Sequence, residues 1–119
     1  MLLIWLEIAI RKGVIVKNRI QQIEKRVAAI RREMAALGDI RPGSATKQKR
    51  SARGKTYAEY WYVSYSFRGK GYTEYVPERA IDAVRKENEN YKRLMELIDE
   101  WTALAIELSK LRIKVASDD

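Results

Sequence analysis

The sequence contains no cysteine and no histidine, and these two absences narrow the chemistry open to the protein. Without cysteine, the chain can form no disulfide and can bind no metal through thiolate ligands. Without histidine, it lacks the side chain most often used as a general base, and the commonest nitrogen ligand for zinc. No phosphate-cradling glycine loop is present either. We therefore expect a protein that is not an enzyme, with no catalytic residues, no metal site and no cofactor.

Long apolar runs are also scarce, and the most apolar segment is the start, MLLIWLEIAI. A membrane-spanning helix needs about 20 apolar residues, whereas Glu7 interrupts this run and Arg11 ends it. Positive charge follows the run, whereas a signal peptide carries it in front. We interpret residues 1–10 as a helical start that is either amphipathic or buried against another subunit. Attachment to a membrane surface and a mis-assigned start codon are the alternatives. The expected location is the cytoplasm, without a membrane partner.

The composition favours one folded, helix-rich domain over residues 1–119. Hydrophobic residues make up 46% of the chain and charged residues 34%, which is typical of folded soluble proteins. The first helical segment is predicted over residues 1–38, because apolar residues recur with alternating spacings of four and three, as in a coiled coil. These residues are Val16, Ile20, Ile23, Val27, Ile30, Met34 and Leu37. Gly38 marks the expected end of the helix, and Gly13 predicts a break or kink within it.

The second helix is predicted over residues 77–116. Pro77 suits the first helical position, and Glu78 and Asp82 place favourable negative charge near the start. Its apolar stripe is broad, which indicates more than one neighbour: the first helix on one side and a second subunit on the other. The stripe consists of Ile81, Val84, Tyr91, Leu94, Ile98, Trp101, Ala105, Leu108 and Val115, widened by Met95, Leu97, Leu104 and Leu111.

Between the helices, residues 39–56 are predicted to form a basic loop and residues 57–76 a β-hairpin. The loop has no helical or strand periodicity, and residues 41–55 contain no acidic residue. From Tyr57 the period becomes two, which places Trp61, Val63 and Tyr65 on one face, with Tyr60 and Tyr62 on the other. The run Arg68–Gly71 supplies the glycines of a tight turn. Since an isolated hairpin is marginally stable, it must pack against the helices or a partner.

The predicted fold class is therefore α+β, mainly α. Two long antiparallel, coiled-coil-like helices carry an inserted β-hairpin, and we expect the helices to dimerise into a bundle. No internal repeat is apparent.

Positive charge is concentrated in the segment between the helices. Residues 41–76 hold eight Lys or Arg against two acidic residues, whereas the whole chain has a net charge of +8. Such a segment favours a polyanion, since each neutralised phosphate releases counterions. The predicted nucleic-acid-binding residues are Arg41, Lys47, Lys49, Arg50, Arg53 and Lys55 in the loop, Arg68 and Lys70 at the hairpin tip, and Tyr60 and Tyr62 as stacking or sugar contacts. A solvated linker, or a site for an acidic protein, explains the same charge.

We therefore predict a non-enzymatic nucleic-acid-binding protein, with DNA favoured over RNA, whose basic loop and aromatic hairpin are presented by a helical dimer. The alternative is a structural or adaptor protein whose helices assemble with a larger protein partner. In that case the aromatic residues serve the strand and its core, since β-strands favour them.

A set of short motifs resembles an uncharacterised family of small prokaryotic proteins. The matching residues lie between about 20 and 112 and comprise Met34–Gly38, Arg41–Ser44, Tyr60–Tyr65 (YWYVSY), Gly69-Lys70, Tyr75-Val76 and Glu89–Arg93. The resemblance implies the helix–hairpin–helix layout. It implies no activity, because the family has no established function. Some similar sequences have a cysteine cluster before the hairpin, which suggests a small zinc-binding element. Here the corresponding loop is KQKRSARGK, which contains no cysteine, so zinc binding is not expected for this chain.

Overall fold

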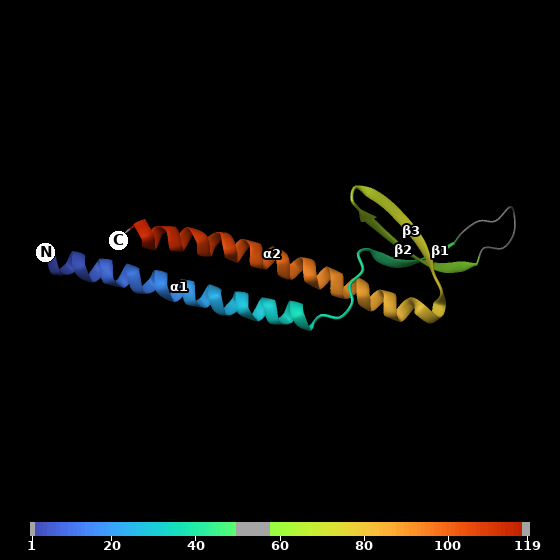
Figure 1. Ribbon diagram of the computed structural model, residues 1–119, viewed down its shortest axis with the longest axis horizontal. Helices are drawn as coiled ribbons and strands as arrows, with labels where there is room; N and C mark the ends of the chain where they lie inside the picture. Colours follow the sequence, from blue (N-terminus) through green and yellow to red (C-terminus); the bar gives the residue numbers. More distant parts are fainter. Residues whose placement is uncertain (1, 50–57, 118–119) are drawn as a thin grey trace. The chain divides into compact units, whose positions relative to one another are not determined.

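The computed structural model of the protein describes residues 2–49 and 58–117 (Figure 1). In chain order the elements are helix α1 (Leu2–Ala36), strands β1 (Ser44–Lys49), β2 (Glu59–Phe67) and β3 (Lys70–Val76), the 3-10 turn η1 (Glu78–Ala80) and helix α2 (Ile81–Ser117). The chain is mainly helical, with a small antiparallel sheet between the two helices in sequence. This agrees with the predicted α+β class. The chain divides into two compact units.

The helical unit comprises α1 and the part of α2 from Glu96 onward. The two helices lie side by side and antiparallel (Figure 1), and ion pairs join Arg19 to Glu107 and Arg26 to Glu100. On α1, Ile23 and Ile30 are fully buried, as the predicted seam requires. The facing side of α2 is a second seam with the same alternating spacing. It consists of Leu97, Trp101, Leu104, Leu108, Leu111 and Val115, all buried or half-buried.

Helix α1 runs without interruption through Gly13, so the predicted break or kink is wrong. A single glycine costs a helix only about 1 kcal/mol relative to alanine, which is small for a helix of 35 residues. The helix ends at Ala36, two residues before the predicted end. Its first turns expose apolar side chains, among them Leu2, Trp5 and Ile15, which are 88, 71 and 65% exposed.

The second unit spans Leu37–Met95 and contains a three-stranded antiparallel sheet in the order β1-β2-β3. The predicted hairpin is confirmed as β2 and β3. Strand β1, however, lies within residues 39–56, which the sequence predicted as loop. The strand was not predicted because it lacks alternating apolar residues. It is an edge strand with mostly exposed side chains, and lysine is typical of such edges. Only Ala45 contributes to the core, opposite Val63.

The core of this unit lies between one face of the sheet and the first turns of α2. It consists of Val63, Val76, Ile81 and Val84, with Ala45, Trp61 and Ala80 packed around it. The chain passes from β3 into α2 through η1, in which the backbone N–H of Ala80 donates to the carbonyl of Pro77 at 2.9 Å. The α-helix therefore begins at Ile81, four residues after the predicted start, because its first turn tightens into 3-10 geometry.

Candidate nucleic-acid interface

The two faces of the sheet have different chemistry, and strand register fixes which residues share a face. Val63 pairs with Ala45 and Trp61 with Val76, so this face packs against α2. The opposite face holds the alternate residues of each strand: Ser44, Thr46 and Gln48 from β1, Tyr60, Tyr62, Ser64 and Ser66 from β2, and Gly71, Thr73 and Tyr75 from β3. None of these residues is charged. We call this set the tyrosine face.

Three tyrosines gather at one end of the tyrosine face. The ring of Tyr75 lies edge-on to those of Tyr60 and Tyr62, with centroids 5.9 and 6.0 Å apart. Tyr60 and Tyr75 are 47 and 56% exposed, and Tyr62 is half-buried. In such a T-shaped contact the edge of one ring meets the face of the other, so the aromatic area open to a planar ligand is the exposed part of the rings. Tyr60 and Tyr75 therefore offer exposed aromatic surface on this face.

The remainder of the tyrosine face carries hydroxyl and amide groups. The hydroxyls of Ser64 and Thr73 lie 3.3 Å apart, and the side-chain amide of Gln48 donates to Thr46 Oγ1 at 3.2 Å. Such groups both donate and accept hydrogen bonds, so they suit the polar edges of bases or sugars. This arrangement provides planar contacts beside neutral hydrogen-bonding groups.

The predicted basic and aromatic site residues do not share one face. Lys47 and Lys49 pair with Trp61 and Glu59, so they lie on the α2-facing side, whereas Tyr60 and Tyr62 lie on the tyrosine face. The Lys49 ammonium is 3.8 Å from the Glu59 carboxylate. Because residues 39–56 were predicted as a loop, the sequence did not indicate on which face Lys47 and Lys49 lie. Only the pairing of β1 with β2 shows this.

Lys47 belongs to a cation–aromatic cluster around Trp61. The Lys47 ammonium lies 5.5 Å from the Trp61 ring centroid, and the Arg85 guanidinium lies 5.1 Å from it. Cations over an indole are attracted by the negative ring face. The indole N–H of Trp61 is buried and has no hydrogen-bond partner among the described residues, where packing and these cations hold the ring.

Arg41 is held in place by an extensive set of contacts. Its backbone N–H donates to the carbonyl of Glu87 at 3.1 Å, and Asn88 Nδ2 donates to its carbonyl at 3.0 Å. Its guanidinium pairs with Glu74 and lies 5.5 Å from the Tyr65 ring centroid. Tyr65 in turn donates to Glu74 Oε1 at 2.7 Å. These contacts tie the segment after α1 to α2 and to the sheet, so Arg41 has a structural role.

The Tyr65–Glu74–Arg41 group also shifts two pKa values. The hydrogen bond from Tyr65, followed by that from Arg41, lowers the pKa of Glu74 from its ordinary value of 4.5. The same bond to the Glu74 carboxylate raises the pKa of Tyr65 from its ordinary value of 10.0. Both shifts favour the protonation states present at neutral pH.

The hairpin tip is a two-residue turn, Arg68-Gly69, and both residues have positive φ, 51° and 78°. Lys70, predicted to lie in the turn, is the first residue of β3 and pairs with Phe67. The Arg68 guanidinium lies 5.0 Å from the Phe67 ring centroid, and the Lys70 ammonium lies 5.4 Å from that of Tyr72. Phe67 and Tyr72 belong to the α2-facing side of the sheet, so the charges at the tip lean away from the tyrosine face.

A shallow cleft of about 250 Å³ opens beside the start of β1. It is lined by Gly43, Ser44, Ala45, Arg85, Asn88, Glu89 and Lys92. Asn88 Oδ1 is buried and has no hydrogen-bond partner within residues 2–49 and 58–117. Sequence reasoning gave no function to Arg85 and Lys92, because helical periodicity alone does not show which charged residues lie beside a strand.

Sequence reasoning also missed Tyr75 as a member of the aromatic cluster. The alternation in β3 places Tyr75 on the same side of the strand as Thr73. Only the pairing of Tyr75 with Tyr62, however, shows that both tyrosines lie on one face of the sheet. Arg50, Arg53 and Lys55 of the predicted site lie outside the described residues.

Comparison with known protein families, curated proteins and solved structures finds no match to this chain. The family resemblance therefore stays a prediction. Within residues 2–49 and 58–117, no helix combines the length and apolar character needed to cross a membrane. The same part of the chain contains no group of three or more acidic side chains placed to hold a metal ion.

Proposed function

We propose that the protein is a non-enzymatic nucleic-acid-binding protein that stacks unpaired bases on its tyrosine face. The observation that supports this most strongly is the exposed edge-on cluster of Tyr60, Tyr62 and Tyr75 on a sheet face without charge. Every base has an aromatic face, so stacking on tyrosine tolerates many sequences, and each stacked base contributes about 1–3 kcal/mol. Hydroxyl and amide groups beside the rings add hydrogen bonds to base edges and sugars.

Phosphate contacts come, in this proposal, from the basic segment that joins β1 to β2. Arg50, Arg53 and Lys55 lie in sequence between Lys49 and Glu59, the residues that close the β1–β2 ladder. Lys47 and Arg41 are already engaged with Trp61 and Glu74, which makes them weaker candidates for phosphate contacts. Charge from the segment and stacking on the face then act together, as is typical of single-strand binders.

Single-stranded DNA is the favoured ligand, with single-stranded RNA second. A β-ribbon that enters a duplex groove with its tip needs side chains that project from that tip. Here Arg68 and Lys70 lean onto Phe67 and Tyr72 of their own hairpin. The geometry therefore supports base stacking better than groove reading.

The test is binding of fluorescently labelled single-stranded and duplex DNA and RNA, measured from about 50 to 200 mM salt. We expect single strands to bind more tightly than duplexes. Tyr60→Ala and Tyr75→Ala should each weaken binding about tenfold, which corresponds to about 1.4 kcal/mol. Tyr60→Phe and Tyr75→Phe are matched controls that keep the ring and should retain most of the affinity. Equal losses in the alanine and phenylalanine variants would contradict stacking.

Charge is tested separately. Reversing Arg50, Arg53 and Lys55 to Glu should weaken binding to all sequences alike and flatten the dependence of log affinity on log salt concentration. An unchanged slope would remove this segment from the interface. No binding of any strand form at low salt would overturn the proposed function.

A structural or adaptor role is the second candidate, and exposed apolar side chains on α1 favour it. Leu3, Leu6 and Ile10 are 75, 58 and 58% exposed, although they belong to the same continuous helix as the buried Ile23 and Ile30. Contiguous exposed apolar surface marks an interaction site. Co-purification separates the two candidates. Nucleic acid that is retained at low salt and lost at high salt favours the first, whereas a protein retained through high salt favours the second.

The proposed assembly is a homodimer formed through the helices. The apolar side chains of the helical unit that α1 and α2 leave exposed support it, since a helix with a second apolar stripe has a second neighbour.

A further inference from the structure

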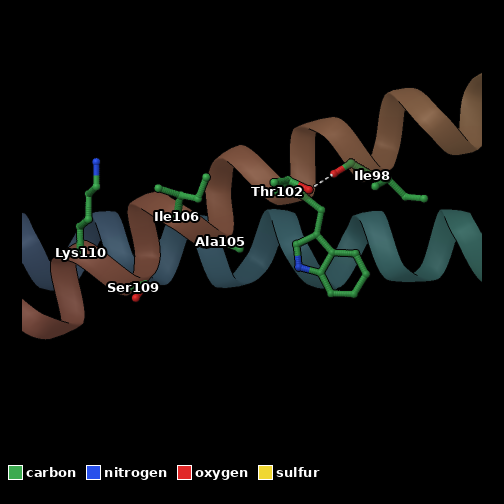
Figure 2. Close-up of a pocket in the computed structure, with 7 residues that line it drawn as sticks. Ile98, Thr102, Ala105, Ile106, Ser109 and Lys110 are labelled. Atoms are coloured by element: carbon green, nitrogen blue, oxygen red, sulfur yellow. Dashed lines mark hydrogen bonds between the residues drawn. The ribbon is translucent and has the colours of Figure 1, made fainter.

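Helix α2 carries a second apolar stripe that α1 does not cover. Ile98, Ile106 and Ile113 are 38, 53 and 63% exposed, whereas Leu97 on the α1-facing side is fully buried. The stripe includes Thr102, Ala105 and Ser109, and the positions 98, 102, 105 and 109 repeat the four–three–four spacing of the first seam. A cavity of about 550 Å³ lies along it, lined by Ile98, Trp101, Thr102, Ala105, Ile106, Ser109 and Lys110 (Figure 2).

We infer that this stripe binds the same stripe of a second copy of the chain, with the two α2 helices antiparallel. The stripe is self-complementary about the midpoint between Ala105 and Ile106. A two-fold axis there places Ile98 opposite Ile113 of the second copy, and Thr102 opposite Ser109. Thr102, Ala105 and Ser109 are small and let the helices approach closely near the centre, and Ile98 and Ile113 cover one another at the two ends.

The charges beside the stripe favour a second copy of the chain as the partner and an antiparallel orientation of the two α2 helices. Asp99 and Lys110 lie on the same flank of the stripe, since eleven residues separate them at 100° per residue. Within residues 2–49 and 58–117, neither side chain forms an ion pair. Antiparallel pairing sets Asp99 of each copy beside Lys110 of the other, twice in one interface. Parallel pairing would turn this flank toward the opposite flank of the second copy and leave both charges without this partner, and an unrelated protein would not be expected to match the pattern.

This inference deepens the dimer element of the proposed function, because it names the surface through which two copies meet. Its readout involves only residues of the helical unit and requires no nucleic acid. A failed dimer test would therefore leave base stacking by the sheet untouched, and a failed binding test would leave the dimer untouched.

The absence of cysteine in the chain makes disulfide trapping the first experiment. Thr102→Cys and Ser109→Cys proteins are oxidised alone and as an equal mixture, after each is shown to keep wild-type helicity. In the antiparallel register, residue 102 faces residue 109 of the second copy. Two copies of residue 102 lie about 10 Å apart along the helix axis, from a rise of 1.5 Å per residue. A disulfide needs Cα atoms about 4.4–6.8 Å apart.

The expected result is a covalent dimer that forms rapidly in the mixture and slowly or not at all in either protein alone. Ala103→Cys mixed with Ser109→Cys is the matched control, because residue 103 is exposed on another side of α2 and should not cross-link. Self-linking of Thr102→Cys alone would show parallel pairing and overturn the inference. Equal cross-linking in all mixtures would show random collision and would also overturn it.

Charge reversal provides a second test by sedimentation equilibrium. Asp99→Lys or Lys110→Asp alone should raise the dimer dissociation constant about tenfold or more, and the double reversal should restore it to within about threefold of wild type. Ile106→Glu should abolish the dimer. A wild-type protein that stays monomeric at about 100 μM would overturn the inference, because a specific interface binds more tightly than that. Failure of the double reversal to restore dimerisation would do the same.

Discussion

Lys47 of β1 lies directly across the ladder from Trp61 of β2, with its ammonium 5.5 Å from the centre of the indole ring. Arg85 contacts the same ring from α2 at 5.1 Å. The cluster therefore links the edge strand, the central strand and the helix. These contacts favour a role for Lys47, a predicted phosphate contact, in the organisation of the sheet unit.

Lys47→Gln is therefore expected to reduce stability and to leave phosphate binding intact. Loss of the cation over Trp61 should lower the free energy of unfolding by about 0.5–1 kcal/mol, measured by urea denaturation. The salt dependence of nucleic-acid binding should not change. Lys49→Gln is the matched control, and the loss of its exposed ion pair with Glu59 should cost less than about 0.5 kcal/mol. A lower salt slope in Lys47→Gln would show that Lys47 contacts a phosphate.

Gly43 is expected to be the least replaceable glycine among those described. Its φ is +109°, and a Cβ at this position would lie 2.3 Å from the Ser64 carbonyl oxygen and 2.8 Å from Tyr65 Cβ. Gly43→Ala should lower the free energy of unfolding by about 2 kcal/mol or more, because both the backbone conformation and the contact with β2 are unfavourable for alanine. Gly71→Ala is the control, since nothing lies within 4 Å of its Cβ position. A similar loss in both variants would contradict this reason.

The contrast between Ile23 and Lys47 shows what could be predicted from the sequence. Ile23 belongs to a helix whose burial follows local spacing, so the seam from Val16 to Leu37 predicted its burial correctly. Tyr60 and Tyr62 were placed on one face for the same reason, because alternation within one strand is also local. Lys47 was predicted to lie in a loop, because β1 has almost no apolar residue and its environment depends on pairing with a distant strand.

In the candidate site, too, features set by local spacing could be predicted, whereas those set by distant contacts could not. The shared face of Tyr60 and Tyr62 could be predicted. The positions of Tyr75, Arg85 and Lys92, by contrast, follow only from strand register and the packing of α2. Arg41 was selected for its charge, but its contacts with Glu87, Asn88 and Glu74 depend on residues more than thirty positions away in sequence. Charge can be read from sequence, whereas the partners of a charge require the fold.

Substitution of Arg68 distinguishes an effect on turn stability from an effect on ligand binding. It has a φ of 51° in a two-residue turn, a conformation that costs most side chains about 1–2 kcal/mol. Asparagine and glycine adopt it readily, so Arg68→Asn should raise the free energy of unfolding by about 0.5–1 kcal/mol. Loss of the cation over Phe67 offsets part of this gain. If Arg68 also contacts nucleic acid, affinity falls while the melting temperature rises. A lower melting temperature in Arg68→Asn would contradict the strain argument.

Glu74 is expected to make stability depend on pH in the acidic range. The hydrogen bond from Tyr65 and the contact with Arg41 lower the pKa of Glu74 in the folded state below its ordinary value of 4.5. Its contribution is therefore fully present above about pH 4.5 and is lost as the pH falls through the lowered pKa. The difference in urea midpoint between wild type and Glu74→Gln should be largest near pH 7 and should shrink below about pH 4.

Tyr65→Phe is the matched variant for this prediction, because it keeps the ring that stacks on Tyr72 at 5.0 Å and removes only the hydroxyl donor. It should weaken the pH dependence without abolishing it, since Arg41 still contacts the carboxylate. The raised pKa of Tyr65 has the opposite sign of effect: its contribution is present below about pH 10 and is lost as the pH rises through the raised value. Glu74→Gln should remove most of this alkaline dependence as well. Wild type and Glu74→Gln with parallel stability profiles from pH 3 to 7 would show that the hydrogen-bonded group contributes nothing to folding.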